Sequence, residues 1–366
     1  MFTKAVMSVQ SVLMIGTDPD GQGGVASVVA VYRRAGFFPR QGVVYVCTHR
    51  GGSLFTKLGR AVLGGGRIAL LLLTGRVSLV HAHVSSHGSF KRKALYLALA
   101  RRCGVPTVFH LHSGGFRRFV EEEASPRLRE RVLNTLRTSS HLIALSQSWA
   151  DYLRTLAPTA CISVLPNPVD MPAQHQLVPG EPGRILFLGR ASETKGVYDL
   201  LTAFADVVKT HAHARLAIGG DGDLGRLRAR ISELSLDQHV EVLGWVAGEQ
   251  KFSQFARSQI YVLPSYHEGL PMGMLEAMAF AKAVVVSPVG GVPEAIEHGV
   301  HGLLVQPGDV NGLARALSTL LADEQYCQEL GTAARARVDA CYSTPLVLER
   351  LSFIYEQVLE PKRSTK

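Results

Sequence analysis

Two glutamates, Glu268 and Glu276, lie eight residues apart in a segment that also holds glycines and a proline. The apolar run Ile260–Leu263 before them is typical of a strand. Pro271 suits the first position of a helix, where its missing N–H costs nothing and its φ is preset. This pattern predicts Glu268 in a strand-to-helix turn and Glu276 on the helix's second turn. The N–H groups of residues 270–273 would then form an anion site.

Carboxylates beside such a helix end favour a ligand that is anionic at one point and hydroxyl-rich elsewhere, as a sugar nucleotide is. The alternative is that both glutamates are solvated acids near a helix start, where acids are common. Spacing alone favours this plainer alternative.

Two cations follow the expected strand Arg184–Leu188 in the segment 189–196, which runs Gly-Arg-Ala-Ser-Glu-Thr-Lys-Gly. Arg190 offers a planar fork and Lys195 a point charge, and both suit a diphosphate. The alternative is a solvated turn, since both residue types are common there.

Two Asp-x-Asp pairs could hold a divalent ion on a diphosphate: Asp18 with Asp20, and Asp221 with Asp223. The second pair lies in the glycine-rich turn 219–225, which has no Gly-Lys-Ser/Thr and so is no Walker A loop. Asp-x-Asp is a common coincidence, and the two cations with a helix end already supply counter-charge. We therefore predict no metal and no cofactor.

Histidines gather in the first half of the chain. The expected strand 107–110 leads to His110 and His112 on one face, followed by Ser113 and Gly114. His81 and His83 likewise share a strand face. One alternative is a metal site of these two with His87, but no fixed ligand set supports it. An acceptor-side role for His83 is favoured. Earlier, Gly23 and Gly24 let the first strand-to-helix loop pass close to a ligand.

The setting Pro-Ser-x-x-Glu-Gly-x-x, followed by Glu-Ala-Met-Ala, closely resembles the signature of the family-4 retaining glycosyltransferases. The similarity runs from about residue 16 to residue 309 and is strongest after residue 186. It implies an α/β fold with two facing Rossmann-like parallel-sheet domains and an interdomain cleft, the GT-B arrangement.

The resemblance also implies roles for residues that match the family's motifs. Glu268 would contact the sugar hydroxyls, Glu276 the nucleotide ribose, and His112 the reacting sugar, while Arg190 and Lys195 would hold the donor phosphates. The predicted catalytic residues are His112, Glu268, Arg190 and Lys195. The predicted donor-binding residues are Gly23, Gly24, Gly189, Arg190, Lys195, Gly220, Asp221, Glu268, Gly269, Leu270, Pro271 and Glu276. The predicted acceptor-side residues are His83, Ser113 and Gly114.

The predicted activity is metal-independent, retaining transfer of a hexose from a nucleotide-diphosphate sugar to a lipid-linked glycan. The segment His-Ser-Gly-Gly-Phe at 112–116 looks like that of members that build bacterial exopolysaccharide. A sugar-nucleotide epimerase, a phosphorylase or a non-catalytic glycan-binding partner are the alternatives.

Charge is uneven along the 366 residues. Residues 1–170 hold 21 Lys+Arg and 8 Asp+Glu, a net +13, and residues 171–366 hold 18 and 22, a net −4. The basic residues fall in amphipathic stretches at 57–76, 90–102 and 116–119, which can lie on an anionic membrane or be core helices with solvated edges. No aromatic platform or motif suggests nucleic acid. Five widely spaced cysteines favour a reducing compartment. We expect a cytoplasmic protein, peripheral on the inner face of the membrane.

Strand-like and helix-like stretches alternate throughout, which predicts parallel sheets with crossover helices. We expect a first domain at 1–170, a second at 171–341, and a closing helix and tail at 342–366. The predicted strands are 9–15, 43–47, 79–83, 107–110, 141–145, 162–165, 184–188, 215–219, 240–243, 260–263, 283–286 and 302–305.

Overall fold

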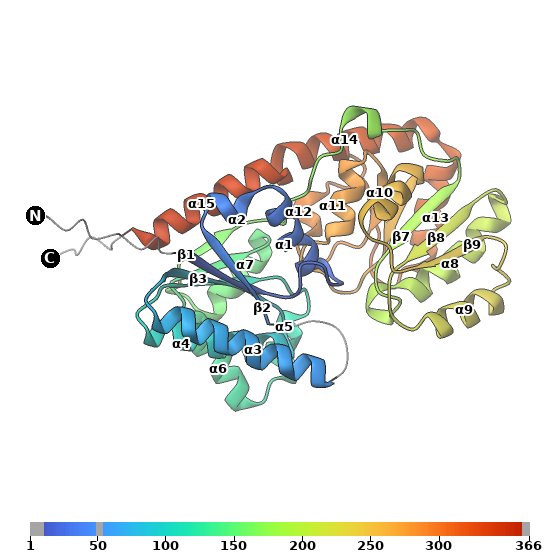
Figure 1. Ribbon diagram of the computed structural model, residues 1–366. Coiled ribbons are helices and arrows are strands. Elements are labelled where there is room, and N and C mark those ends of the chain that lie inside the picture. Colours follow the sequence, from blue (N-terminus) through green and yellow to red (C-terminus); the bar gives the residue numbers. More distant parts are fainter. Residues whose placement is uncertain (1–10, 49–53, 361–366) are drawn as a thin grey trace, which may run out of the picture. The chain divides into compact units, whose positions relative to one another are not determined.

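A computed structural model of the chain describes residues 11–48 and 54–360 (Figure 1). It contains two parallel sheets of six strands each, which confirms the predicted α/β class. The chain divides into two compact units. Unit 1 comprises residues 1–168 and 344–366, and unit 2 comprises Val169–Ser343.

The sheet of unit 1 has the strand order β2-β1-β3-β4-β5-β6. Its strands are β1 (Ser11–Gly16), β2 (Val43–Cys47), β3 (Val77–Val84), β4 (Thr107–Leu111), β5 (His141–Ala144) and β6 (Ile162–Val164). The predicted strands agree with these to within two residues at each end that is described. Residues 9 and 10 of the first predicted strand lie outside the described residues.

Helices cover both faces of this sheet. They are α1 (Gly24–Arg34), α2 (Phe37–Arg40), α3 (Leu54–Leu73), α4 (His87–Arg102), α5 (Phe116–Arg118), a π-helical turn η1 (Phe119–Glu123), α6 (Pro126–Thr138), α7 (Gln147–Leu156) and α15 (Thr344–Leu359). Figure 1 shows α1 and α15 on one face and α3, α4 and α6 on the other. Phe90, Phe109 and Phe116 are fully buried in the core beneath α4 and α6.

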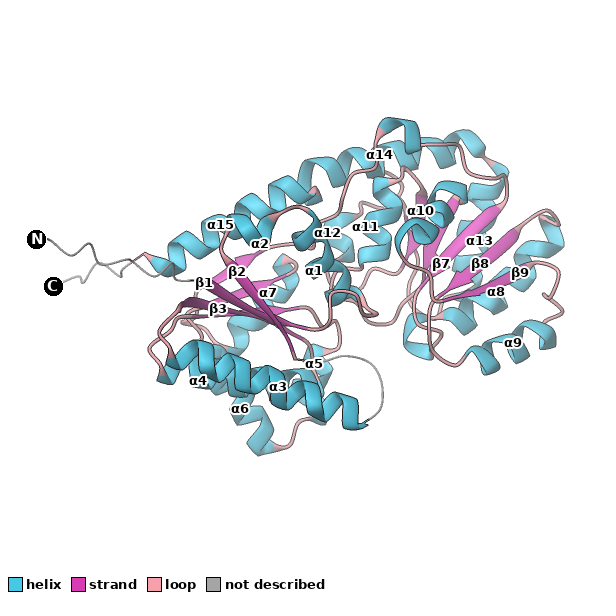
Figure 2. Cartoon of the chain, in the orientation of Figure 1, coloured by secondary structure: helices cyan, strands magenta, loops and turns pink. Residues whose placement is uncertain are grey.

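The sheet of unit 2 has the order β12-β11-β10-β7-β8-β9. Its strands are β7 (Arg184–Leu188), β8 (Arg215–Gly219), β9 (Val240–Gly244), β10 (Ile260–Leu263), β11 (Ala283–Val286) and β12 (Leu303–Leu304). Figure 2 shows its strands and helices by colour. The helices are η2 (Gln174–Gln176), η3 (Glu193–Lys195), α8 (Val197–Thr210), α9 (Leu224–Glu233), α10 (Gly248–Arg257), α11 (Met272–Ala279), α12 (Val292–Ala295), α13 (Val310–Ala322) and α14 (Glu324–Tyr342).

In each sheet the order in which successive strands are added reverses at one point. In unit 2 it moves from β7 outward to β9 and then returns to the other side of β7 as β10. In unit 1 the same reversal separates β1 from β3. The loops at the carboxyl ends of the strands around such a point form the usual ligand crevice of an open α/β sheet.

The basic stretches of unit 1 have different surroundings. On α3, Val62, Leu63, Leu70 and Leu73 are each 64–76% exposed, so an apolar face of this helix points to solvent. On α4, Lys91 is exposed but Lys93 is only 3% exposed. The prediction of a solvated basic rim is therefore wrong for Lys93, whose side chain turns into the unit. No described helix is both long enough and apolar enough to span a bilayer.

Candidate active site

Most of the predicted donor residues of unit 2 lie in loops at one edge of its sheet. The segment 189–196 follows β7, the segment 220–223 follows β8, and the segment 264–271 follows β10. These loops are tied by backbone bonds: Ala191 N–H donates to the Asp221 carbonyl at 2.7 Å, and Tyr266 N–H to the Thr194 carbonyl at 2.9 Å. Because β10, β7 and β8 are neighbours in the sheet, residues far apart in sequence meet at its carboxyl edge.

Glu268 and Lys195 form an ion pair at this edge. Lys195 Nζ lies 2.5 Å from Glu268 Oε1, and Glu268 is 9% exposed while Lys195 is partly exposed. The two residues were predicted from separate sequence motifs, and in the structure they are in direct contact. The pair places a carboxylate together with a counter-ion in a largely water-excluded position. Such a carboxylate is a strong acceptor for ligand hydroxyl groups.

Glu276 is held in the same way by a residue that the sequence analysis missed. Lys251 Nζ, on α10, lies 2.5 Å from Glu276 Oε1, and Glu276 is also 9% exposed. The sequence around Lys251 is that of an ordinary surface helix, so nothing in it predicts this contact. Glu276 lies on the second turn of α11, as predicted. Pro271 precedes that helix as its N-cap, with φ −71° and ψ 124°, and is not its first residue.

Two glycines let these loops approach each other. A Cβ at Gly220 would lie 1.9 Å from the Gly189 carbonyl oxygen, and one at Gly290 would lie 2.0 Å from the carbonyl oxygen of Glu268. Both positions have positive φ, which other residues rarely adopt. Gly220 therefore lets the loop after β8 lie against the loop that carries Arg190, and Gly290 lets the loop after β11 lie against the loop that carries Glu268.

The remaining donor-side residues differ in exposure. Arg190 is exposed, with no side-chain contact to a described residue, whereas Gly269, Leu270 and Gly220 are buried. Asp221 is partly exposed and Asp223 caps α9, accepting the Arg226 N–H at 2.9 Å.

The first loop of unit 1 lies at the end of β1. Gly23, with φ 107°, is the N-cap of α1, and Gly24 is the first residue of that helix; both are exposed. A Cβ on either would meet nothing within 4 Å. Asp20 forms an ion pair with Arg33 of α1. Asp20 and Asp223 are thus committed to other partners, and each belongs to one of the Asp-x-Asp pairs.

The acceptor-side residues predicted in unit 1 also meet at the carboxyl ends of their strands. His83 of β3 and His112, which follows β4, are joined by a 2.8 Å contact between Nδ1 and Nε2. Next to them, the Ser113 and Ser86 hydroxyls are 2.7 Å apart, and Gly114 is partly exposed. Asn167 hydrogen-bonds to His112. No pattern in the sequence singles out Asn167 for this contact.

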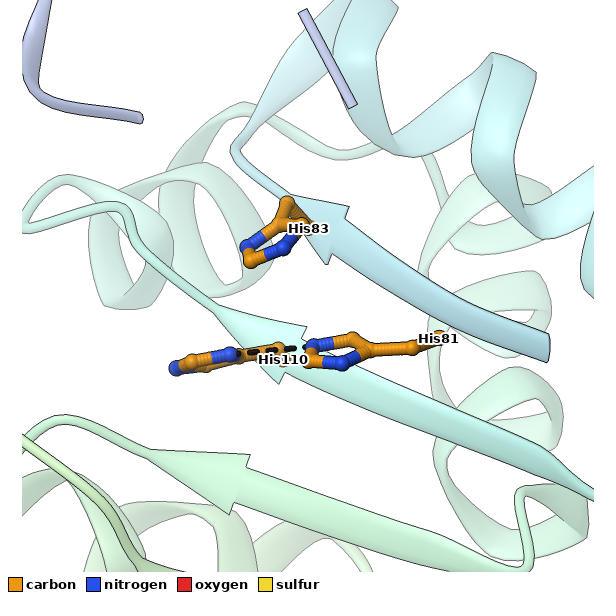
Figure 3. A group of neighbouring side chains, drawn as sticks. All are labelled: His81, His83 and His110. Atoms are coloured by element: carbon orange, nitrogen blue, oxygen red, sulfur yellow. Dashed lines mark hydrogen bonds between the residues drawn. The ribbon is translucent and has the colours of Figure 1, made fainter. Parts of the chain in front are cut away.

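His112, itself partly exposed, contacts a group of three buried histidines, His81, His83 and His110, which Figure 3 shows. His81 Nε2 lies 3.1 Å from His110 Nδ1, along the dashed line, and the His83 ring stacks on His81. The other nitrogen of His81 lies 2.6 Å from the hydroxyl of Tyr355 on α15. Burial lowers the pKa of His81 to about 3 and that of His83 and His110 well below the usual value. Burial, with the Lys93 charge, also lowers the pKa of His112 to about 3.

The alternative metal set of His81, His83 and His87 is wrong in its third member. His87 is exposed and its Nε2 lies 2.6 Å from Glu123. His110 takes that place, and the three rings could each offer a nitrogen within 4.8 Å of the others. Both nitrogens of His81 are already used in hydrogen bonds, so ligation would require breaking one of them.

Comparisons with known proteins identify the family of the chain. The family model "Glycosyl transferases group 1" matches residues 173–337, and "Glycosyltransferase Family 4" matches residues 22–171. The glycogen synthase of Mycobacterium tuberculosis is 28% identical over 76% of this chain and 69% of its own length. The amylovoran biosynthesis glycosyltransferase AmsK of Erwinia amylovora is 29% identical over 69% of this chain and 63% of its own.

Solved structures show the same fold. Anabaena HepE, in complex with UDP and glucose, has a TM-score of 0.76 at 20% identity and covers 95% of this chain and 100% of its own. Sucrose-phosphate synthase from Thermosynechococcus elongatus has a TM-score of 0.77 at 20% identity, over 95% of this chain and 99% of its own. Two Rossmann-like units with residues gathered at their carboxyl edges thus define a protein of the GT-B class. The chain belongs to the family-4 glycosyltransferases, whose second half is the group 1 domain.

Proposed function

We propose that this glycosyltransferase transfers a hexose from a nucleotide-diphosphate sugar with retention of configuration and without a metal ion. The observation that carries the proposal is the buried Glu268–Lys195 pair at the reversal point of unit 2, beside the start of α11. Glu268 accepts hydrogen bonds from the sugar hydroxyls, and Glu276, held by Lys251, accepts those of the ribose. That HepE was solved with UDP and glucose supports a donor of this kind.

Charge stabilisation in the transition state comes from cations already in place. As the bond from the sugar to the diphosphate breaks, negative charge grows on the β-phosphate. Arg190, exposed and without an ion-pair partner among the described residues, and Lys195 neutralise that charge, with the N-terminus of α11 adding its dipole. The acceptor hydroxyl attacks from the face that the phosphate leaves, which gives retention. His112 contacts the reacting sugar as a neutral imidazole.

The acceptor we propose is a lipid-linked glycan in bacterial exopolysaccharide synthesis, reached from the cytoplasmic face of the membrane. Similarity to AmsK, named for amylovoran biosynthesis, supports this class of product. The exposed apolar face of α3, within a half of the chain that carries a net +13, supports contact with an anionic bilayer.

Donor binding tests the first proposal. Thermal melting of the full chain with a panel of nucleotide sugars identifies the donor, since a bound ligand raises the melting temperature in proportion to ln(1 + [L]/Kd). With that donor and a lipid-linked acceptor, we expect release of the nucleoside diphosphate and an α-linked product from an α-linked donor. An epimerised nucleotide sugar, or a requirement for inorganic phosphate, would instead favour the epimerase or the phosphorylase.

Vesicle flotation tests the membrane proposal. The protein should bind vesicles that contain phosphatidylglycerol better than neutral ones, and salt should release it, because attraction between exposed charges decays within about 10 Å at 0.1 M ionic strength. Leu63→Ser with Leu70→Ser on α3 should weaken binding. Val178→Ser, which removes an exposed apolar side chain from unit 2, is the matched control. Equal binding by all three proteins would exclude the α3 face.

A further inference from the structure

On the second turn of α4 the side chain of Lys93 points into the interior of unit 1. No described acidic residue pairs with it. Lys93 is 3% exposed, and its Nζ donates a 2.7 Å hydrogen bond to Ser89 Oγ. No described carboxylate forms an ion pair with it, and the ionisable groups that act on its charge are Arg92, which disfavours it, and the Cys47 thiol, which favours it. Burial and the Arg92 charge lower the pKa of Lys93 to about 7. A buried ammonium group is costly unless an anion faces it.

The groups around Lys93 offer donors and few acceptors. Ser89 Oγ accepts the bond from Lys93 and another, of 3.2 Å, from the Ser85 N–H, so its own proton is directed to neither. Arg92 Nε is buried and has no partner among the described residues. Of the three N–H groups of the ammonium, one is used within the described part of the chain. Three neighbouring residues of the first two turns of α4 thus carry donor groups for which no further acceptor is found among the described residues.

This cluster lies close to the predicted acceptor side. The charge of Lys93 contributes to the lowered pKa of both His83 and His112, so its ammonium lies near these rings. His83 is fully buried and its Nε2 has no partner among the described residues. The donor phosphates are already assigned to Arg190 and Lys195 of unit 2. With those two cations assigned to the donor, we assign an anion beside Lys93 to the acceptor.

We propose that the first two turns of α4 form a binding site for a phosphate or diphosphate group of the acceptor, with Lys93, Ser89 and Arg92 as its donors. The identity of the anion as part of the acceptor depends on the function proposed above. The diphosphate that joins a glycan to its lipid carrier fits the donors chemically, because it brings several acceptor oxygens and more than one negative charge. A soluble phosphate-bearing acceptor has the same chemistry.

Calorimetric titration of the full chain tests the site. Saturating UDP is present throughout to occupy the donor site, and the titrants are inorganic pyrophosphate and farnesyl diphosphate. Lys93→Met should weaken binding of both about tenfold or more, because a hydrogen bond to a charged group is lost in a buried position. Lys91→Met, which removes the same charge from an exposed position two residues away, should leave binding unchanged.

Thermal melting separates lost binding from lost folding. Lys93→Met should melt at or above the wild-type temperature, since it replaces an unpaired buried charge with an apolar chain of similar length. If Lys93→Met melts below the wild type, the Ser89→Ala variant is used instead, because it keeps the charge of Lys93 and removes one hydrogen-bond donor. Weaker binding of pyrophosphate by Ser89→Ala than by the wild type supports the site. Unchanged binding overturns it. Equal losses in Lys91→Met and Lys93→Met, or no binding of either titrant to the wild type, also overturn it.

The two titrants identify the source of the anion. Tighter binding of farnesyl diphosphate than of pyrophosphate supports a lipid-linked acceptor, and equal affinities support a soluble one. Failure of this site with intact UDP binding and sugar transfer leaves the proposed function standing. A chain that binds pyrophosphate through Lys93 but neither UDP nor any nucleotide sugar refutes the proposed function and leaves the anion site.

Discussion

The two units treat their buried ionisable side chains in opposite ways. In unit 2 the two buried carboxylates each contact a lysine, Glu268 with Lys195 and Glu276 with Lys251. In the described part of unit 1 Lys93 has no acidic partner, and the histidines bond to one another and to the hydroxyl of Tyr355. Unit 2 therefore carries balanced charges at its candidate site, and unit 1 carries neutral rings with an unbalanced cation.

This difference fits two kinds of ligand contact. The two carboxylates, each in contact with a lysine, are suited to accept hydrogen bonds from hydroxyl groups, and the exposed Arg190 remains for phosphate. Neutral imidazoles donate one hydrogen bond and accept another, which suits sugar hydroxyls that do both. With a pKa of about 3, His112 is not a general acid at neutral pH.

The largest effect we expect is selective unfolding of unit 1 by acid. The histidine pKa values are lowered in the folded state, so below about pH 6.5 the unfolded chain binds protons that the folded chain does not. Stability is intact above that pH and falls as the pH drops toward the folded pKa values. For His81 alone the loss is about 1.4 kcal/mol per pH unit.

The two tryptophans report on the two units separately. Trp149 is buried in unit 1, whereas Trp245 is 43% exposed in unit 2. Fluorescence of Trp245→Phe should show unit 1 unfolding near pH 5, and Trp149→Phe should show unit 2 persisting to lower pH. Replacing His81 with Gln should flatten the pH dependence, while His213→Gln in unit 2 should not. Unfolding of unit 2 at the higher pH would contradict the comparison.

The second effect concerns the backbone that positions Glu268. Gly290→Ala forces a side chain into a left-handed conformation and places its Cβ against the Glu268 carbonyl oxygen. Gly244→Ala has a similar φ of 69° but meets nothing within 4 Å, so it should lose only about 1–2 kcal/mol. We expect Gly290→Ala to lose clearly more stability in urea titration, and transfer activity as well. Equal losses would show that the contact does not constrain the loop.

The third effect tests the role of Glu268. Glu268→Gln keeps the shape of the side chain but loses its charge, so transfer should fall roughly 10- to 100-fold, the range for a hydrogen bond to a charged group. The melting temperature should fall, because Lys195 loses its ion-pair partner, but the protein should stay folded and should still bind UDP. Glu297→Gln, at an exposed glutamate of the same unit, is the control. Near-normal turnover of a folded Glu268→Gln protein would remove this residue from the site.

The sequence predicted the strands, and most of the residues that it singled out lie in the loops directly after them, because parallel-sheet proteins present polar side chains where apolar runs end. Both Glu268 and Lys195 were found from such motifs. Lys251 and Asn167 were missed, since each acts through a contact across many residues and neither lies in a distinctive pattern. Lys93 was misjudged for a related reason: Lys91 and Lys93 look alike in sequence, and only the rotation of α4 decides which one is buried.

The smallest effect we expect is that of chelation. Arg190 and Lys195 supply the cations that a diphosphate needs in unit 2, and Asp223 is committed to the cap of α9. In unit 1, His81 uses both ring nitrogens in hydrogen bonds. EDTA should therefore leave sugar transfer largely unchanged after dialysis. If EDTA abolishes activity, the metal that restores it identifies the ligands. Recovery with Mg²⁺ or Mn²⁺ alone indicates oxygen ligands such as Asp221, whereas recovery with Zn²⁺ indicates the histidines. Either recovery would show that a bound metal ion has a role in one unit that we assign to side chains of that unit.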